Sequence, residues 1–272
     1  MVKITLKDGS VLEMEQGSTA LDAAQKISEG LARNALACEI NGETRDLMTP
    51  INEDCSLSIL TFQDEMGRWT LRHTASHILA QAVKRLYPHV LVAIGPAIEN
   101  GFYYDFDIDA PFTAEDLQKI EAEMKKIVKE NIKIERFTMN REEAIAYFKE
   151  QDEIYKQELV ENLPEGAEIS FYRQGDFTDL CAGPHLPSTG KVKALRLTSS
   201  TGAYWRGDSD KKMLKRIYGT AFMKNAELEE YLAAVEEAKK RDHNKIGREL
   251  EYFTTVDTIG QGLPILLPNG AR

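Results

Sequence analysis

The chain has 272 residues, 42% of them hydrophobic and 29% charged, which is typical of a globular protein with room for two or more domains. Its net charge of −10 argues against nonspecific adhesion to nucleic acid, and it has no apolar run of about 18 residues that could span a membrane. Because the alternating N-terminal sequence also lacks the apolar core of a signal peptide, we expect a cytoplasmic location and no membrane contact.

The first 62 residues predict a small α+β unit. Two hairpins turn at Asp8-Gly9 and Asn41-Gly42, which are strong turn signals between alternating runs. A helix lies between them and is capped by Ser18 or Thr19, and a strand ends the unit. This order of elements predicts a ubiquitin-like β-grasp domain over residues 1–62.

A larger α+β domain is predicted over residues 63–224. Its first seven residues break the apolar pattern and indicate a linker, and from Trp69 a helix runs until it stops before Pro88. Further helices and strands follow, with predicted helix caps at Thr113, Asn140 and Asp152. The pattern predicts an antiparallel sheet with flanking helices.

One long, charged, amphipathic helix is predicted from Asn225. We expect residues 225–242 to form a linker helix. The apolar segment "GLPILLPNGAR" then ends the chain without a partner to pack against. We therefore expect residues 243–272 to be the truncated start of a third domain.

A basic stretch lies within residues 188–218. Eight lysines and arginines there face only two aspartates, a local charge of +6. Either this stretch is a solvated face, or it contacts phosphates on an otherwise acidic protein.

Two paired motifs carry the chemistry. His73 and His77 share one helix face at i, i+4, and Cys181 precedes His185 by the same spacing in a loop rich in Gly and Pro. Cys38 and Cys55 lie in strand-like runs and are expected in the core. The four residues of the two motifs are compatible with a closed zinc site, with a Cys181 nucleophile, or with metal-free acid–base chemistry on a water molecule.

Three further polar residues are candidates for the same site. Asp179 lies two residues before Cys181 and could bind a cation or an ammonium group. Lys156 in "IYKQEL" and Tyr104 in "GFYYDFD" complete the set. Taken alone, Lys156 is better explained as an ordinary surface lysine and Tyr104 as a tyrosine at the edge of the core.

The chain resembles a known family over its whole length. "LRHTASHILAQAVKRLYP", "GPAIENGFYYDFD" and "GDFTDLCAGPHLPSTG" resemble the editing domain of bacterial threonyl-tRNA synthetases. Residues 1–62 resemble the TGS domain of these enzymes, and "KRDHNKIGRELEYF" followed by "GLPILLPNGA" resembles the entry to their class II catalytic core. The paired motifs alone are shared with alanyl-tRNA editing domains, and the flanking segments make the resemblance specific.

The resemblance implies hydrolysis of a mischarged tRNA. Threonine and serine differ by one methyl group, which a binding pocket can discriminate by only about 1–3 kcal/mol. A second site would therefore hydrolyse the ester of seryl-tRNA(Thr). The implied roles are water activation by His73, charge stabilisation by Lys156 and ammonium binding by Asp179. The remaining residues would shape the pocket and contact substrate: His77, Tyr104, Cys181 and His185.

The resemblance also sets expectations for cofactors and partners. Editing would need no metal, whereas ATP, Mg and Zn would belong to the catalytic core, nearly all of which would lie beyond Arg272. The partner would be the acceptor end of tRNA(Thr), with serine as the amino-acid moiety. The full-length protein, a homodimer, would ligate threonine to tRNA(Thr) with ATP, and this chain would be a monomer that edits without aminoacylating. A zinc-binding module and a noncatalytic tRNA-binding module are the alternatives.

Overall fold

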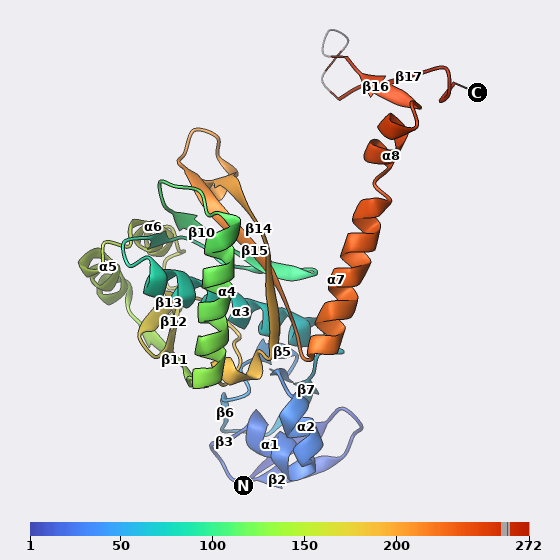
Figure 1. Ribbon diagram of the computed structural model, residues 1–272. Coiled ribbons are helices and arrows are strands. Elements are labelled where there is room, and N and C mark those ends of the chain that lie inside the picture. The colour runs from blue at the N-terminus through green and yellow to red at the C-terminus, as the bar shows by residue number, and fades with distance from the viewer. Residues whose placement is uncertain (257–259, 261, 272) are drawn as a thin grey trace. The chain divides into compact units, whose positions relative to one another are not determined.

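The structure is a computed structural model that describes residues 1–256, 260 and 262–271 (Figure 1). The chain divides into two compact units, residues 1–225 and 226–272, which are described separately. The predicted mixed α+β class is confirmed, because helices accompany several mainly antiparallel sheets.

The first part of unit 1 has the β-grasp arrangement. One sheet has the strand order β2-β1-β7-β4-β5, in which β1 and β7 run parallel, and β3 pairs with β6. These elements are β1 (Val2–Leu6), β2 (Val11–Met14), β3 (Ser18–Thr19), α1 (Ala20–Ile27), α2 (Glu29–Asn34), β4 (Ala37–Ile40), β5 (Glu43–Arg45), β6 (Pro50–Ile51) and β7 (Cys55–Leu60). Both predicted hairpins are confirmed, and the Thr19 side chain caps α1.

The second part of unit 1 holds two further sheets. One has the order β14-β15-β10-β8 with β9 attached to β10, and the other has the order β11-β12-β13. The strands are β8 (Leu91–Val92), β9 (Ala97–Ile98), β10 (Gly101–Asp107), β11 (Ile134–Met139), β12 (Ile169–Gln174), β13 (Phe177–Leu180), β14 (Ala194–Tyr204) and β15 (Met213–Phe222). The helices are α3 (Glu65–Leu86), α4 (Ala114–Glu130), α5 (Arg141–Glu150) and α6 (Ile154–Glu161), with short 3₁₀ turns at Thr189–Lys191 and Trp205–Gly207.

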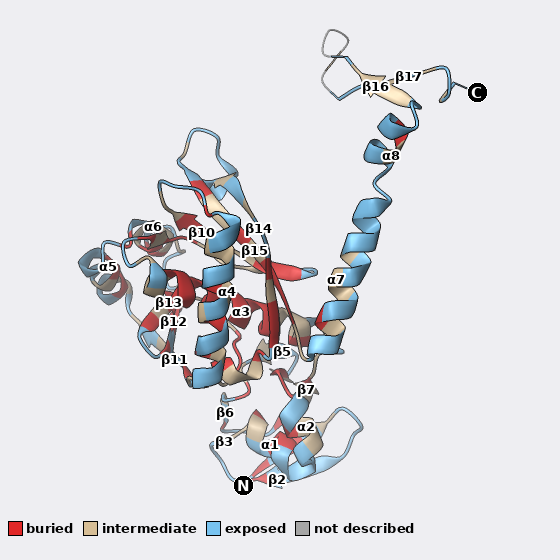
Figure 2. Cartoon of the chain, in the orientation of Figure 1, coloured by how far each residue is buried: buried red, intermediate tan, exposed pale blue. Residues whose placement is uncertain are grey.

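Helix α3 forms the centre of this part, and Figure 2 shows most of its length as buried. Leu71, Ile78 and Leu79 belong to its main hydrophobic core, which also includes side chains of β10 and α4. This helix also carries buried polar residues, and it can therefore hold polar side chains in fixed positions inside the domain. None of the described helices combines the length and apolarity that crossing a membrane requires.

Two predicted helix starts are wrong. Helix α3 begins at Glu65 and not at Trp69, so most of the predicted linker is helical; an acidic residue in the first turn suits the helix dipole. Helix α6 begins after Glu153, while Asp152 lies in the left-handed region at φ 55° and caps nothing by its side chain. The predicted caps at Thr113 and Asn140 are confirmed, each with a reciprocal capping box.

In the C-terminal part, two helices replace the single long helix that the sequence predicts. The predicted helix is interrupted at Asp242. The carboxylate of Asp242 accepts the Asn244 and Lys245 amides and so caps the start of a new helix. The elements are α7 (Asn225–Lys240), α8 (His243–Glu249), β16 (Phe253–Thr255) and β17 (Pro264–Leu266). The predicted limits at 225–242 and 243–272 stay predictions, and residues 257–259, 261 and 272 lie outside the described residues.

Candidate functional site: a buried histidine–cysteine cluster

The structure brings the two paired motifs together in one cluster. His73 and His77 project from α3, Cys181 follows β13, and His185 lies in the loop beyond it. One ligand atom of each of the four side chains lies within 4.8 Å of the others. The three histidines are buried, and Cys181 is partly exposed.

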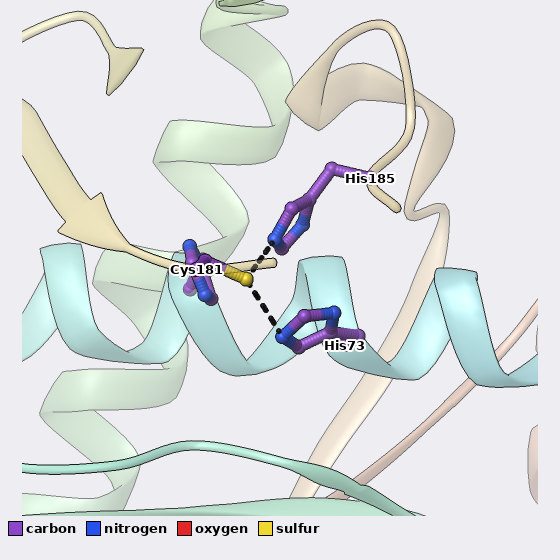
Figure 3. A group of neighbouring side chains, drawn as sticks. His73, Cys181 and His185 are labelled. Atoms are coloured by element: carbon purple, nitrogen blue, oxygen red, sulfur yellow. Dashed lines mark hydrogen bonds between the residues drawn. The ribbon is translucent and has the colours of Figure 1, made fainter. Parts of the chain in front are cut away.

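The Cys181 sulfur lies between two imidazoles (Figure 3). Its Sγ is 3.3 Å from His73 Nε2 and 3.2 Å from His185 Nε2. The Gly183 amide also donates to this sulfur, at 3.2 Å. Sequence positions more than a hundred residues apart thus form one polar centre.

Thr74 sets the tautomer of His185. The single Thr74 hydroxyl proton is donated to the Thr70 carbonyl at 2.9 Å, and the same oxygen accepts the Leu186 amide at 3.0 Å. His185 Nδ1 lies 3.2 Å from that oxygen and must therefore donate its own proton to it. The Nε2 lone pair of His185 is left facing Cys181, where it can accept the thiol proton.

Gly183 allows the loop to close over the cluster. Its φ of +74° lies in the left-handed region, and a Cβ at this position would come within 2.0 Å of the Tyr172 hydroxyl oxygen. The Tyr172 ring in turn contacts the His185 ring, with centroids 4.4 Å apart. A side chain at position 183 would therefore displace the residues that support His185.

Gly183→Ala is expected to destabilise the protein more than Gly166→Ala does. Both glycines have a similar positive φ, which costs an ordinary residue about 1–2 kcal/mol. The Gly166 Cβ would meet nothing within 4 Å, whereas the Gly183 Cβ would overlap Tyr172. The free energies of unfolding in urea would measure the difference, and equal losses would contradict it.

A second polar group adjoins the first. The Asp179 carboxylate on β13 forms a buried ion pair with Lys156 of α6 and accepts the Tyr104 hydroxyl of β10 at 2.6 Å. Lys156 Nζ also donates to Tyr104 Oη at 3.0 Å. His77 Nε2 lies 3.5 Å from Asp179 Oδ2 and joins the two groups. All seven residues that the sequence singles out thus converge.

Burial decides the protonation states of the cluster. It lowers the pKa of His77 to about 4, and together with the charge of His77 it lowers the pKa of His73 to about 3. The pKa of His185 is also well below its ordinary value, chiefly because of burial. Burial raises the pKa of the Cys181 thiol to about 12. At neutral pH the metal-free cluster therefore holds neutral imidazoles and a thiol, which is a poor nucleophile.

Asp179 keeps its charge for a different reason. Burial raises the pKa of its carboxyl, but the Lys156 ammonium, His77 and the hydrogen bonds from Lys156 and Tyr104 outweigh burial, so the net shift is downward. Burial and the charge of Asp179 hold the pKa of Tyr104 well above its usual range. The pair therefore carries one negative and one positive charge out of contact with solvent.

The stability of the metal-free protein is expected to fall as the pH falls below 6.5. The three cluster histidines take up protons near pH 6.5 when unfolded, but only well below that value when folded. Unfolding thus binds protons in this window, and each histidine contributes a slope of up to about 1.4 kcal/mol per pH unit. Urea unfolding in a chelator from pH 7.5 to pH 5 would measure it. A free energy of unfolding that does not change with pH would contradict the assignment of this effect to the cluster histidines. So would a pH dependence that disappears in His89→Ala.

The donor set also fits a zinc ion. Bonds of about 2.0–2.3 Å place tetrahedral ligand atoms about 3.3–3.8 Å apart, close to the contacts between Cys181 and the imidazoles. His73, His77, Cys181 and His185 would supply all four ligands, and Cys181 would bind as a thiolate. Such a site would be closed and structural.

Two hollows are each lined in part by one of the seven site residues. One of about 440 Å³ is lined by Lys156, Glu153 and Phe177 among others. Another of about 690 Å³ is lined by His185, Tyr172 and Arg136 among others. Both volumes lie in the range of small-molecule pockets.

Two contributors are missing from the sequence-based set. Thr74 orients His185, and its place between His73 and His77 is the one sequence signal that could have indicated it. Asp46 of the N-terminal domain accepts the His185 amide at 2.6 Å from 139 residues away. No local pattern around Asp46 indicates that contact.

The structure changes the interpretation of the basic stretch. Five of its eight cations form ion pairs with acidic residues elsewhere in the chain: Arg196 with Glu121, Arg206 and Lys211 with Glu158, Lys212 with Asp107, and Arg216 with Asp105. Lys191 donates to the Ala32 and Arg33 carbonyls. The local charge of +6 is thus largely compensated, which weakens the interpretation of this stretch as a phosphate-contacting patch.

Two family models match parts of the chain. Residues 2–61 match the TGS domain. Residues 169–218 match the second additional domain of threonyl and alanyl tRNA synthetases, and this range includes Asp179, Cys181 and His185.

Similar proteins cover nearly the whole chain. A threonine--tRNA ligase of Clostridium botulinum (strain Kyoto / Type A2) is 64% identical over 270 residues, which is 99% of this chain. A threonine--tRNA ligase of Acetivibrio thermocellus is 62% identical over the same length. The chain spans 42% of the length of each relative.

Proposed function

We propose that this chain hydrolyses the ester of seryl-tRNA(Thr). The proposal is supported by its matches to the TGS domain and to the second additional domain of threonyl and alanyl tRNA synthetases. It is also supported by the similarity of the chain to part of the threonine--tRNA ligases. Ligation of threonine to tRNA(Thr) with ATP is proposed for the full-length protein. The partner is the acceptor end of tRNA(Thr), in the cytoplasm. The full-length protein is proposed to be a homodimer and this chain a monomer.

The observation that carries the proposal is the buried Lys156–Asp179 pair beside neutral imidazoles. An aminoacyl ester bears an ammonium group next to its carbonyl, so its hydrolysis needs an anion, a positioned water and a cation for the developing charge. Asp179 supplies the anion, His73 can hold or deprotonate the water, and Lys156 supplies the cation.

The ion pair suggests how the substrate enters. Asp179 has Lys156 as its partner in the free protein, so the seryl ammonium must take the place of that cation. The displaced Lys156 is then free to face the ester carbonyl or the leaving ribose oxygen, while Tyr104 keeps its bond to Asp179. The exchange keeps one positive charge beside the carboxylate throughout, so Asp179 is not left unpaired, and the displaced Lys156 ammonium is the cation that meets the charge developing on the ester.

The chemical step is an ordinary ester hydrolysis. The water oxygen attacks the carbonyl carbon as His73 accepts a water proton. The bond from the carbonyl carbon to the ribose oxygen then breaks, and the proton passes to that oxygen. The products are free serine and tRNA with an intact terminal hydroxyl, and neither metal nor covalent intermediate is needed.

Selectivity requires rejection of threonine. Both amino acids carry the hydroxyl group, so threonyl-tRNA must be refused by a clash with its extra methyl group. His77, His185 and Cys181 form the wall that the serine hydroxyl is proposed to contact. These residues are buried or partly buried and closely packed, so the wall can yield little to an added methyl.

The test is deacylation of seryl-tRNA(Thr) by the metal-stripped chain, with threonyl-tRNA(Thr) assayed beside it. Fast, serine-selective hydrolysis is expected without added metal. Activity that appears only when zinc is restored would overturn the metal-free mechanism. Absence of hydrolysis with and without zinc would contradict a deacylase activity of this chain.

A zinc-stabilised module without catalysis is the second candidate, favoured by the four ligand atoms within 4.8 Å. It predicts one bound zinc per chain and unfolding by chelator. A noncatalytic tRNA-binding module is less well supported, since most cations of the basic stretch are paired. It predicts salt-dependent tRNA binding without ester hydrolysis.

A further inference from the structure

Asp46 joins the N-terminal domain to the loop that carries the cluster. It follows β5, and its Oδ1 accepts the His185 amide at 2.6 Å. Its Oδ2 accepts the Tyr172 hydroxyl at 2.7 Å. A single carboxylate of one domain therefore holds a backbone group and a side chain of the other.

These two contacts hold the loop directly at His185 and indirectly through Tyr172. The Tyr172 ring lies against the His185 ring, and its hydroxyl fills the space that a Cβ of Gly183 would need. The His185 amide is held at the same time, so the position of the imidazole follows from Asp46. Thr74 holds Nδ1 at the edge of the ring, which leaves Nε2 facing Cys181.

The contact uses both oxygens of the Asp46 carboxylate, one for each donor. An apolar contact could join the two domains, but it would leave the His185 amide and the Tyr172 hydroxyl without this partner. Burial raises the pKa of Asp46, and the hydrogen bonds from His185 and Tyr172 act in the opposite direction by favouring the carboxylate. The net shift of the Asp46 pKa is upward because burial outweighs these two hydrogen bonds, and both bonds favour the carboxylate form.

We propose that Asp46 is a positioning residue for the editing site, so that the N-terminal domain completes a site whose reacting groups all lie in the second domain. This inference rests on the proposed function for its catalytic consequence. Asp46 touches neither the reacting groups nor the ion pair directly, and it acts through the placement of His185 and its loop.

The first test measures the loop without reference to activity. In Asp46→Ala, hydrogen–deuterium exchange of the 181–186 segment is expected to be at least about 10-fold faster, because a bond to a charged acceptor is lost. Asp46→Asn is expected to remain near the unaltered chain, since its amide oxygen can still accept the His185 amide. Asp54→Ala is the matched control: Asp54 accepts the Lys3 amide at 2.7 Å within the same domain.

The second test measures editing. Single-turnover deacylation of seryl-tRNA(Thr) by Asp46→Ala is expected to be about 10- to 100-fold slower at saturating protein, with the half-saturating concentration unchanged. Asp46→Asn is expected to restore most of the rate, and Asp54→Ala to change nothing. If Asp46 only stabilised the fold, its loss would not lower the deacylation rate while leaving the half-saturating concentration unchanged. Nor would Asp46→Asn then restore the rate.

The outcomes separate the two proposals. Unchanged exchange in Asp46→Ala, or an unchanged deacylation rate, would overturn the positioning role. If the unaltered chain deacylates nothing, the proposed function fails, while exchange still decides whether Asp46 fixes the loop. Should Asp46→Ala not fold, Tyr172→Phe removes one of the two bonds and is expected to speed exchange of the 181–186 segment by a smaller factor. No change there would also overturn the role.

Discussion

Replacing His73 by alanine is expected to slow deacylation of seryl-tRNA(Thr) by about 10²–10⁴-fold, the usual contribution of a general base. Burial lowers the pKa of His73 to about 3, so its imidazole is neutral at pH 7 and can orient a water molecule, although it is a weak base for deprotonating it. Single-turnover hydrolysis at pH 7 measures the change, and a thermal melt checks that the variant is folded at the assay temperature.

The matched control is His89→Ala, which removes an exposed histidine outside the cluster. It is expected to leave deacylation unchanged. If His73→Ala kept full activity, another group would have to handle the water. If it lost activity together with a stoichiometric zinc ion and its folded structure, the zinc-site interpretation would replace the hydrolytic one.

Replacing Lys156 by methionine is expected to cost about 3–5 kcal/mol of unfolding free energy and to abolish editing. Methionine keeps most of the side-chain volume but leaves Asp179 buried without its cation. The cost arises from this uncompensated charge, which the bond from Tyr104 cannot neutralise. Urea unfolding and single-turnover deacylation measure the two effects.

The double variant Lys156→Met with Asp179→Asn separates stability from catalysis. Removing both charges is expected to recover much of the lost stability, because no unpaired charge stays buried. Editing should remain abolished, since both the ammonium site and the stabilising cation are gone. Additive losses of stability would show that the pair is not coupled, and recovered editing would exclude these roles.

The sequence by itself determined the features that depend on near neighbours. The Asn41-Gly42 turn takes left-handed backbone angles that these residues tolerate, and the Thr19 cap with Asp22 closes within three residues. His73 and His77 share a face because helical spacing places i and i+4 together. The seven residues proposed for the site were named from such motifs and from the family resemblance.

Only the tertiary structure decided which distant groups meet. Nothing near Lys156 in the sequence indicates that it pairs with Asp179, and nothing near Asp46 indicates that it holds the His185 amide. Packing also neutralised most of the basic stretch, whose partners lie on other elements. Local patterns encode turns, caps and faces over a few residues, whereas ion pairing and burial depend on which elements the whole fold brings into contact.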